Sequence, residues 1–164
     1  MIITTLLPEM KIAKSNLELI EFVITTCNYK FIEPQEEVDI REVLNKYEIE
    51  IDFGKRDIKT EKQAILFNVV VKTTINQTDN PQPGYQIFAE GISVFRLQHP
   101  EKLEDKTLSN LKNISALSIA INNLRNYITN MTTYGPFGKY IFPAVDINQL
   151  IRKKIENQNK KKTK

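Results

Sequence analysis

Apolar and polar residues alternate in several segments of the chain up to Leu97, as is typical of β-strands. Residues 17–32 are rich in β-branched and aromatic side chains and end at a Glu-Pro pair. Residues 47–53 alternate strictly between apolar and acidic positions, which predicts a strand with one solvated face. Residues 62–75 and 85–97 flank a turn rich in Asn, Pro and Gly and predict a hairpin. Together these segments predict a four-stranded antiparallel sheet.

Two smaller features modify this picture. Residues 35–46 carry apolar side chains at helical spacing and predict one or two helical turns. Gly91 lies in the middle of the last strand, where a glycine often marks a β-bulge. We therefore expect a bulge at Gly91.

The third predicted strand is apolar on both faces. Alternation puts one set on one face and a second set on the other: Ile65, Phe67, Val69 and Val71; then Ala64, Leu66 and Val70. A helix can cover one face, but the other also needs cover, because an exposed face of this kind favours aggregation. Burying each such side chain is worth roughly 1.5–3 kcal/mol. We expect a second copy or a bound chain to cover what one domain leaves bare.

The spacing becomes helical after the sheet segments. Apolar positions step by three and four along one stretch: Leu108, Leu111, Ile114, Leu117, Ile121, Leu124, Ile128 and Met131. This spacing predicts one long amphipathic helix. A second helix is expected to begin near Asp146, which suits an N-cap. The expected fold class is α+β, a four-stranded antiparallel sheet packed by one long helix and a second, C-terminal helix.

The segment between the two predicted helices is unusually apolar. Two glycines and two prolines exclude a regular helix or a central strand there. Five large apolar side chains nevertheless crowd nine positions: Tyr134, Phe137, Tyr140, Ile141 and Phe142. Because surface loops are rarely so apolar, we interpret this segment as part of a binding surface.

Composition and charge indicate one soluble domain with a basic appendix. The 164 residues are 41% hydrophobic and 26% charged, with no apolar run long enough to span a bilayer. Residues 152–164 hold seven basic residues and one acidic residue, although the whole chain has a net charge of only +3. We expect residues 1–151 to form the domain and residues 152–164 to be a disordered basic tail.

The same features predict where the protein works. The apolar start of the chain lacks basic residues and is interrupted by Pro8 and Glu9, so no signal peptide is expected. A single cysteine, Cys27, cannot form an internal disulfide and suits a reducing compartment. The expected location is the cytoplasm, without stable membrane insertion.

Residues that could carry out catalysis are few. The sole histidine, His99, precedes a proline in a connecting loop, and no second histidine or cysteine cluster accompanies it. Cys27 lies inside a predicted strand without a fixed basic neighbour, which favours a structural thiol. Residues 135–139 contain two glycines and a lysine, but lack the spacing of a phosphate-binding loop. We expect no enzyme, no metal site and no cofactor.

The element order and several short segments resemble the SecB family of bacterial protein-export chaperones. Residues 117–128 look like the family's long helix, and residues 135–137 and 141–147 resemble its crossover loop. Residues 89–95 resemble its fourth strand, so the resemblance covers roughly residues 17–151. It implies an ATP-independent holdase that binds unfolded or precursor polypeptides for export, assembled as a dimer of dimers. Some relatives are instead dedicated to one client, such as an antitoxin.

The resemblance also implies a client groove and a docking surface. The groove would combine the loop residues Tyr134, Phe137, Tyr140, Ile141 and Phe142 with Phe67, Val69, Ile92, Val94, Phe95, Leu124 and Ile128. Docking on the SecA motor would use acidic sheet positions, for which the candidates are Glu90, Glu48, Glu50 and Asp52. Proteins of that family are typically acidic and also use a C-terminal tail for this docking, whereas the tail here is basic. A nucleic-acid-binding protein that uses the Lys-rich tail is the alternative of another class.

Overall fold

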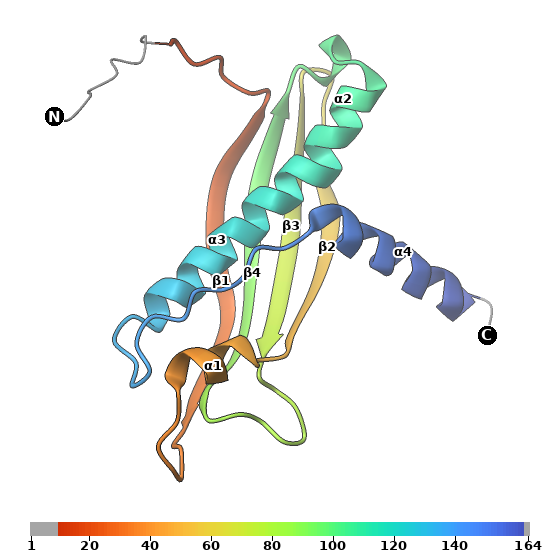
Figure 1. The fold of residues 1–164 in the computed structure, drawn as a ribbon. Coiled ribbons are helices and arrows are strands. Elements are labelled where there is room, and N and C mark those ends of the chain that lie inside the picture. The colour runs from red at the N-terminus through yellow and green to blue at the C-terminus, as the bar shows by residue number, and fades with distance from the viewer. Residues whose placement is uncertain (1–9, 163–164) are drawn as a thin grey trace, which may run out of the picture.

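The computed structural model describes residues 10–162 and contains one four-stranded sheet (Figure 1). The strands are β1 (Leu17–Ile32), β2 (Ile49–Thr60), β3 (Ala64–Ile75) and β4 (Gly84–Gln98). All neighbouring strands are antiparallel, and their order across the sheet is β1-β4-β3-β2. The sheet therefore has two edge strands, β1 on one side and β2 on the other.

The helices lie on one side of this sheet (Figure 1). They are α1 (Ile40–Asn45), the short turn η1 (Pro100–Lys102), α2 (Asp105–Asn110), η2 (Leu111–Ser115), α3 (Ala116–Met131) and α4 (Ile147–Lys162). The predicted long helix corresponds to α2, η2 and α3, which follow one another without a break, with η2 as a π-helical turn. The expected N-cap is also present, because the Asp146 carboxylate accepts a hydrogen bond from the Gln149 N–H at 2.9 Å. The expected α+β fold class is confirmed.

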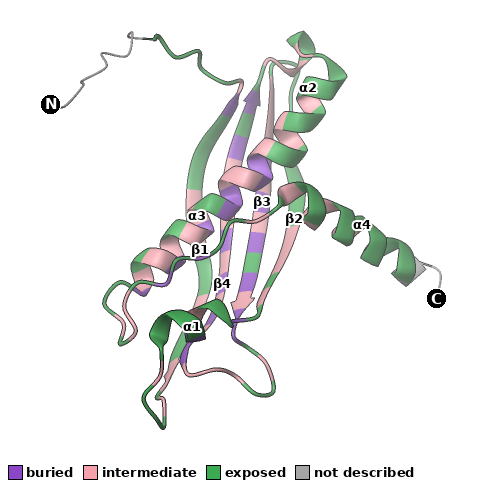
Figure 2. Ribbon diagram, viewed as in Figure 1, coloured by how far each residue is buried: buried purple, intermediate pink, exposed green. Residues whose placement is uncertain are grey.

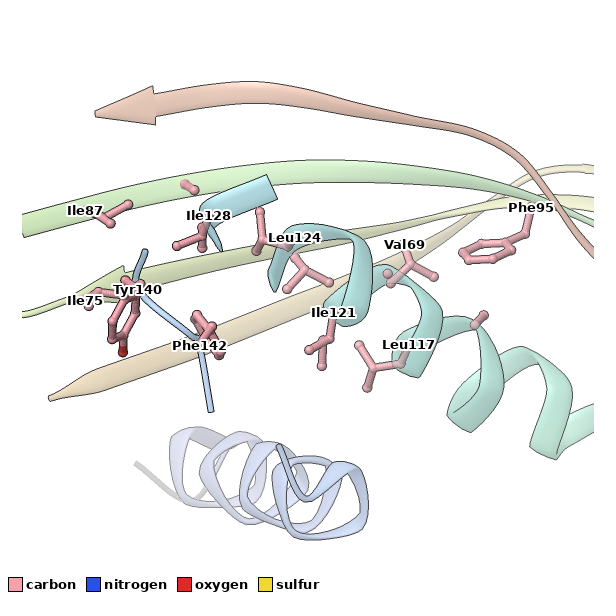
Figure 3. Packing of buried hydrophobic residues seen from close by; sticks show 14 of the residues in the cluster. Val69, Ile75, Ile87, Phe95, Leu117, Ile121, Leu124, Ile128, Tyr140 and Phe142 are labelled. Atoms are coloured by element: carbon pink, nitrogen blue, oxygen red, sulfur yellow. The ribbon is translucent and has the colours of Figure 1, made fainter. Parts of the chain in front are cut away.

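The core lies between α3 and one face of the sheet. Apart from half-buried Ile65, the odd-numbered residues of β3 and β4 are buried on this face, and α3 packs against them with Leu117, Ile121, Leu124 and Ile128 (Figures 2 and 3). Strict alternation along β3 and β4 puts these residues on one face, as the sequence predicts. Each buried side chain contributes roughly 1.5–3 kcal/mol.

The other face of the sheet carries the second apolar set. Leu66, Val70, Phe88, Ile92 and Val94 are half-buried there by their neighbours in the sheet. Among residues 10–162, the helices lie on the other side of the sheet (Figure 1), and only α4 reaches the outer face, at its β2 edge, where it borders a cleft with Lys72, Phe88 and Glu90. A single chain therefore leaves most of this apolar outer face uncovered, as the apolar residues on both faces of β3 predict.

Gly91 does not form the expected bulge in β4. The pairing of β3 with β4 has no register shift, whereas β1 shifts between Leu19 and Glu21 and between Ile24 and Thr26. Gly91 lies opposite Ile24, and a Cβ atom on it would come within 2.7 Å of the Phe22 ring. The glycine therefore makes room for Phe22, and the irregularity falls on the edge strand.

Replacing Gly91 by alanine is expected to destabilise the protein by about 1–3 kcal/mol, because the Phe22 ring must move. Gly54→Ala is the matched control in the same sheet, since nothing lies within 4 Å of a Cβ atom there. Urea denaturation gives the free energies of unfolding. The Gly91→Ala/Phe22→Ala double variant should lose less than the sum of the two single losses. Strictly additive losses would contradict the contact.

The C-terminal segment also differs from the expectation. Residues 152–162 are helical as part of α4, so a boundary at residue 151 falls inside a helix rather than at the start of a disordered tail. Lys, Arg, Gln and Glu are good helix formers, and no Gly or Pro interrupts the chain after Pro143. In Figure 1, α4 begins beside β2 and projects away from the sheet.

Candidate functional site

The apolar segment after α3 is anchored on the sheet by its own aromatic residues. We call residues 132–146 the crossover loop. Tyr140 and Phe142 are 3% and 2% exposed and belong to the core, where Tyr140 lies beside Ile75 (Figure 3). The Tyr140 N–H donates to the Thr132 hydroxyl at 2.9 Å, and Arg125 donates to the Phe142 carbonyl at 3.0 Å. These two aromatic residues therefore hold the loop down.

Two tyrosines that the sequence does not single out complete this anchor. The Tyr85 hydroxyl donates to the Gly138 carbonyl at 2.7 Å and accepts from the Phe137 N–H at 3.1 Å. The Tyr47 hydroxyl donates to the Pro83 carbonyl at 2.9 Å and accepts from the Tyr85 N–H at 2.7 Å. Burial raises the pKa of Tyr47 to about 12, so its hydroxyl remains a donor at neutral pH.

The crossover loop also exposes apolar side chains. Tyr134 is 98% exposed and Ile141 is 71% exposed, whereas Phe137 is half-buried against Phe31 with ring centroids 5.1 Å apart. The apolar side chains of the crossover loop thus serve two different purposes. Some aromatic residues fasten the loop to the sheet, and Tyr134 and Ile141 are available to a partner.

The seven sheet and helix positions expected in the groove are divided between two faces. Phe67, Val69, Phe95, Leu124 and Ile128 are buried in the core, with the Phe67 and Phe95 rings stacked at 5.5 Å. Ile92 and Val94 lie on the outer face, because they alternate with the inward residues of β4. The structure does not bring the twelve expected residues together in one groove.

A cavity of about 300 Å³ instead opens between β2, the beginning of α3, and α4. We call it the β2 pocket, and it is lined by Phe53, Lys55, Val69, Lys112, Asn113, Leu117, Ile151 and Ile155. Its walls are apolar except for two lysines and one asparagine. The α4 side chains Ile151 and Ile155 close one side, and Ile155 is 52% exposed. Val69 is the only residue of the expected groove that lines this pocket.

The polar side chains of the β2 pocket are partly paired with one another. The Lys112 ammonium lies 2.8 and 2.9 Å from the Asp57 carboxylate oxygens and 5.6 Å from the centre of the Phe67 ring. Lys55 donates to the Asn113 side-chain oxygen. Burial and the neighbouring Lys112 lower the pKa of Lys55, although Asp57 opposes the shift.

A lysine of α4 binds the edge strand beside this pocket. Lys154 donates to the Asp52 carboxylate and to the Phe53 carbonyl, the latter at 2.9 Å. Burial raises the pKa of Asp52, but hydrogen bonds from Lys154 and the Phe53 N–H outweigh it, so the net pKa is lowered. A larger, open cleft of about 940 Å³ lies along the same contact, between the β2 side of the sheet and α4. Strand β2 pairs with β3 on one side only.

The four acidic docking candidates do not form a uniformly acidic surface. Glu50, Asp52 and Glu90 share the outer face, and Glu48 precedes β2. Lys72 lies 3.8 Å from Asp52, while Glu90 accepts a hydrogen bond from the Thr25 hydroxyl at 2.8 Å. Basic residues therefore interrupt the acidic ones on this face.

The remaining candidate residues have structural surroundings. The Cys27 sulfur lies 3.3 Å from the Met131 sulfur, and half-exposed His99 lies 3.4 Å from the Glu101 carboxylate. Across residues 10–162, no group of His, Cys, Asp and Glu could hold a metal ion. None of the helices in that range is both long and apolar enough to cross a membrane.

Comparisons with known proteins show similarity only in structure. No family profile matches the chain, and no curated protein matches its sequence. A SecB-like chaperone from Mycobacterium tuberculosis, in complex with a ChAD peptide from the HigA1 antitoxin, is 9% identical with a TM-score of 0.49 over 79% of this chain and 91% of that chain. A protein of unknown function from Streptococcus agalactiae is 7% identical with a TM-score of 0.52 over 81% of this chain and 100% of that chain. The latter similarity concerns the fold alone.

Proposed function

We propose that this chain is an ATP-independent chaperone that holds non-native polypeptides, and that the β2 pocket is one of its client sites. The observation that carries the proposal is an open apolar cavity beside a strand edge without a partner strand in residues 10–162. An unfolded client exposes apolar side chains that such a cavity can bury, and its backbone can add hydrogen bonds along β2. The SecB-like element order and motifs of the sequence point to the same function.

Further weak sites would strengthen the binding of a long client. Tyr134 and Ile141 expose apolar surface on the crossover loop, and the outer face adds more. A chain that occupies several such sites at once gains avidity without sequence specificity. The expected groove residues that are buried in the core would then support these sites rather than touch the client.

The charges on the outer face bear on whether the protein serves general export or a dedicated client. General export with hand-over to SecA would need an acidic docking surface, but Asp52 is bound to Lys154 and lies near Lys72. We therefore favour a cytoplasmic chaperone that serves a dedicated client, such as an antitoxin, over one that docks on the export motor. A homo-oligomer, formed first through β1 and then as a dimer of dimers, belongs to the same proposal.

Nucleic-acid binding by the basic C-terminus is the second candidate. Arg152, Lys153 and Lys160 are exposed on α4, which projects from the sheet. This role would give strongly salt-dependent binding that is lost when residues 152–164 are removed. Lys154 already serves within the chain, because it fastens α4 to β2.

Removing the exposed apolar wall of the β2 pocket is expected to weaken client binding about tenfold, which corresponds to partial loss of one buried Ile side chain. The variant is Ile155→Ser. Ile58→Ser is the matched control, because Ile58 is also 52% exposed and lies on β2 but does not line the pocket. The measurements are suppression of aggregation of an unfolded client without nucleotide, and client affinity by fluorescence anisotropy. Wild-type protein that neither suppresses aggregation nor binds the client would refute the proposed function.

A further inference from the structure

The β2 pocket carries more positive than negative charge. It contains the ammonium groups of Lys55 and Lys112, and the adjacent carboxylate of Asp57 pairs with Lys112. Within residues 10–162, Lys55 forms no ion pair within 4.0 Å, and its hydrogen bond goes to the neutral side chain of Asn113. One cation of the pocket is therefore left without a matching anion.

Lys55 is also placed where an arriving chain would meet it. Its Cα lies opposite Val69 in the β2–β3 register, on the pocket side of the sheet, and the residue is exposed. Beyond it lie the apolar walls formed by Leu117, Ile151 and Ile155. A ligand that enters between α4 and β2 thus meets an apolar cavity and a cation together.

An extended polypeptide can satisfy both features at once. Side chains at positions i and i+2 of a strand lie on the same face, about 6–7 Å apart. One of them can fill the cavity while the other reaches the ammonium group beside it. The Phe53 N–H and carbonyl are already bonded to Asp52 and Lys154, but the free side of β2 beyond Phe53 offers backbone groups to such a strand. A simple lipid would leave these groups unused.

We propose that the β2 pocket selects client segments in which an apolar residue and an acidic residue are two positions apart. The apolar side chain fills the cavity, and the carboxylate pairs with Lys55. This selectivity rests on the proposed chaperone function and specifies its clients. The lowered pKa of Lys55 agrees with the geometry, because partial burial of its ammonium group and the neighbouring Lys112 disfavour its charge, and an incoming carboxylate would favour it.

The test uses short fluorescent peptides with blocked ends, so that no terminal charge contributes. Three peptides share one sequence around a central Leu-Thr-X, where X is Asp, Asn or Lys. We expect the Asp peptide to bind wild-type protein about fivefold more tightly than the Asn peptide, as for a partly exposed ion pair, and the Lys peptide to bind most weakly. Added salt should reduce the difference.

Lys55→Met should abolish the preference for Asp while the Asn peptide still binds. Lys59→Met is the control, because Lys59 lies on β2 outside the pocket and pairs with Glu61. It should keep the preference. Laurate, which carries an apolar chain and a carboxylate without a peptide backbone, should compete weakly.

The outcomes separate this inference from the proposed function. Equal binding of the Asp and Asn peptides by wild-type protein, or a preference that survives in Lys55→Met, overturns the selectivity but leaves the chaperone role standing. If laurate displaces all three peptides and the protein shows no preference for the Asp peptide, the pocket binds lipid and the proposed selectivity is overturned. If no peptide binds and wild-type protein neither suppresses aggregation nor binds an unfolded client, the proposed function itself fails.

Discussion

Replacing Phe142 by alanine is expected to destabilise the protein by about 3–5 kcal/mol, a large part of the total stability of a small domain. Phe142 is 2% exposed and lies in the core beside Tyr140, although it belongs to a loop (Figure 3). The shortened side chain would leave a cavity between the crossover loop and the sheet. The Arg125 hydrogen bond to the Phe142 carbonyl would lose the packing that positions it. Urea denaturation followed by circular dichroism measures the loss.

Tyr134→Ala is the matched control on the same loop. Tyr134 is 98% exposed, so its replacement should change the free energy of unfolding by less than about 0.5 kcal/mol. If the two variants have the same denaturation midpoint, the loop is not anchored as described. Client affinity provides a separate readout, because Tyr134→Ala and Ile141→Ser should weaken binding only if the exposed part of the loop contacts the client.

The strands and the long helix could be predicted from the sequence because their patterns are local. Alternation between Ile49 and Phe53 predicts which side chains of β2 face the core, and the register confirms it through the pairing of Ile49 with Ile75. The spacing of three and four after Leu108 predicts the helix, although the π turn at Leu111–Ser115 gives no sequence signal.

The crossover loop shows the limit of such patterns. Its composition predicts an apolar segment, but it does not separate Phe142, which is buried, from Ile141, which is exposed. That difference depends on Tyr85, whose hydroxyl group bonds to the loop backbone at Phe137 and Gly138, and on Tyr47, whose hydroxyl group accepts from the Tyr85 N–H. Both tyrosines occupy ordinary strand or pre-strand positions, so only their contacts reveal this role.

The β2 pocket was beyond prediction for another reason. Its residues come from β2, β3, η2, α3 and α4, and beside it Lys154 contacts Asp52 across 102 positions of sequence. No motif links segments so far apart when each contributes one or two side chains. The sequence predicts one part of it, because the expected second helix carries apolar residues at helical spacing that continue past residue 151: Ile147, Leu150, Ile151 and Ile155.

Strand β1 is expected to join two copies of the chain. It is 16 residues long and pairs only with β4, which leaves its other edge without a partner strand in residues 10–162. Leu19, Ile20, Val23 and Tyr29 are each 38–44% exposed along it. Soluble proteins rarely leave a long, apolar strand edge open, because it pairs readily with another chain. Antiparallel pairing of two β1 strands would continue the sheet and its outer face across both copies.

Changing Ile20 and Val23 together to lysine should convert this dimer to a monomer. The substitutions remove apolar side chains worth roughly 1.5–3 kcal/mol each when buried. In a symmetric antiparallel pair, the new lysines of one copy also lie near those of the other copy and repel them. We expect dimerisation to weaken at least about 100-fold. Analytical ultracentrifugation at micromolar concentration measures it. Ile58→Lys, on the opposite edge strand, should remain dimeric. Circular dichroism should show that the wild type, the double variant and Ile58→Lys are all folded and unfold cooperatively on heating. A monomeric wild type would refute the interface, and a variant that stays dimeric would move the contact to the outer face around Val70 and Ile92.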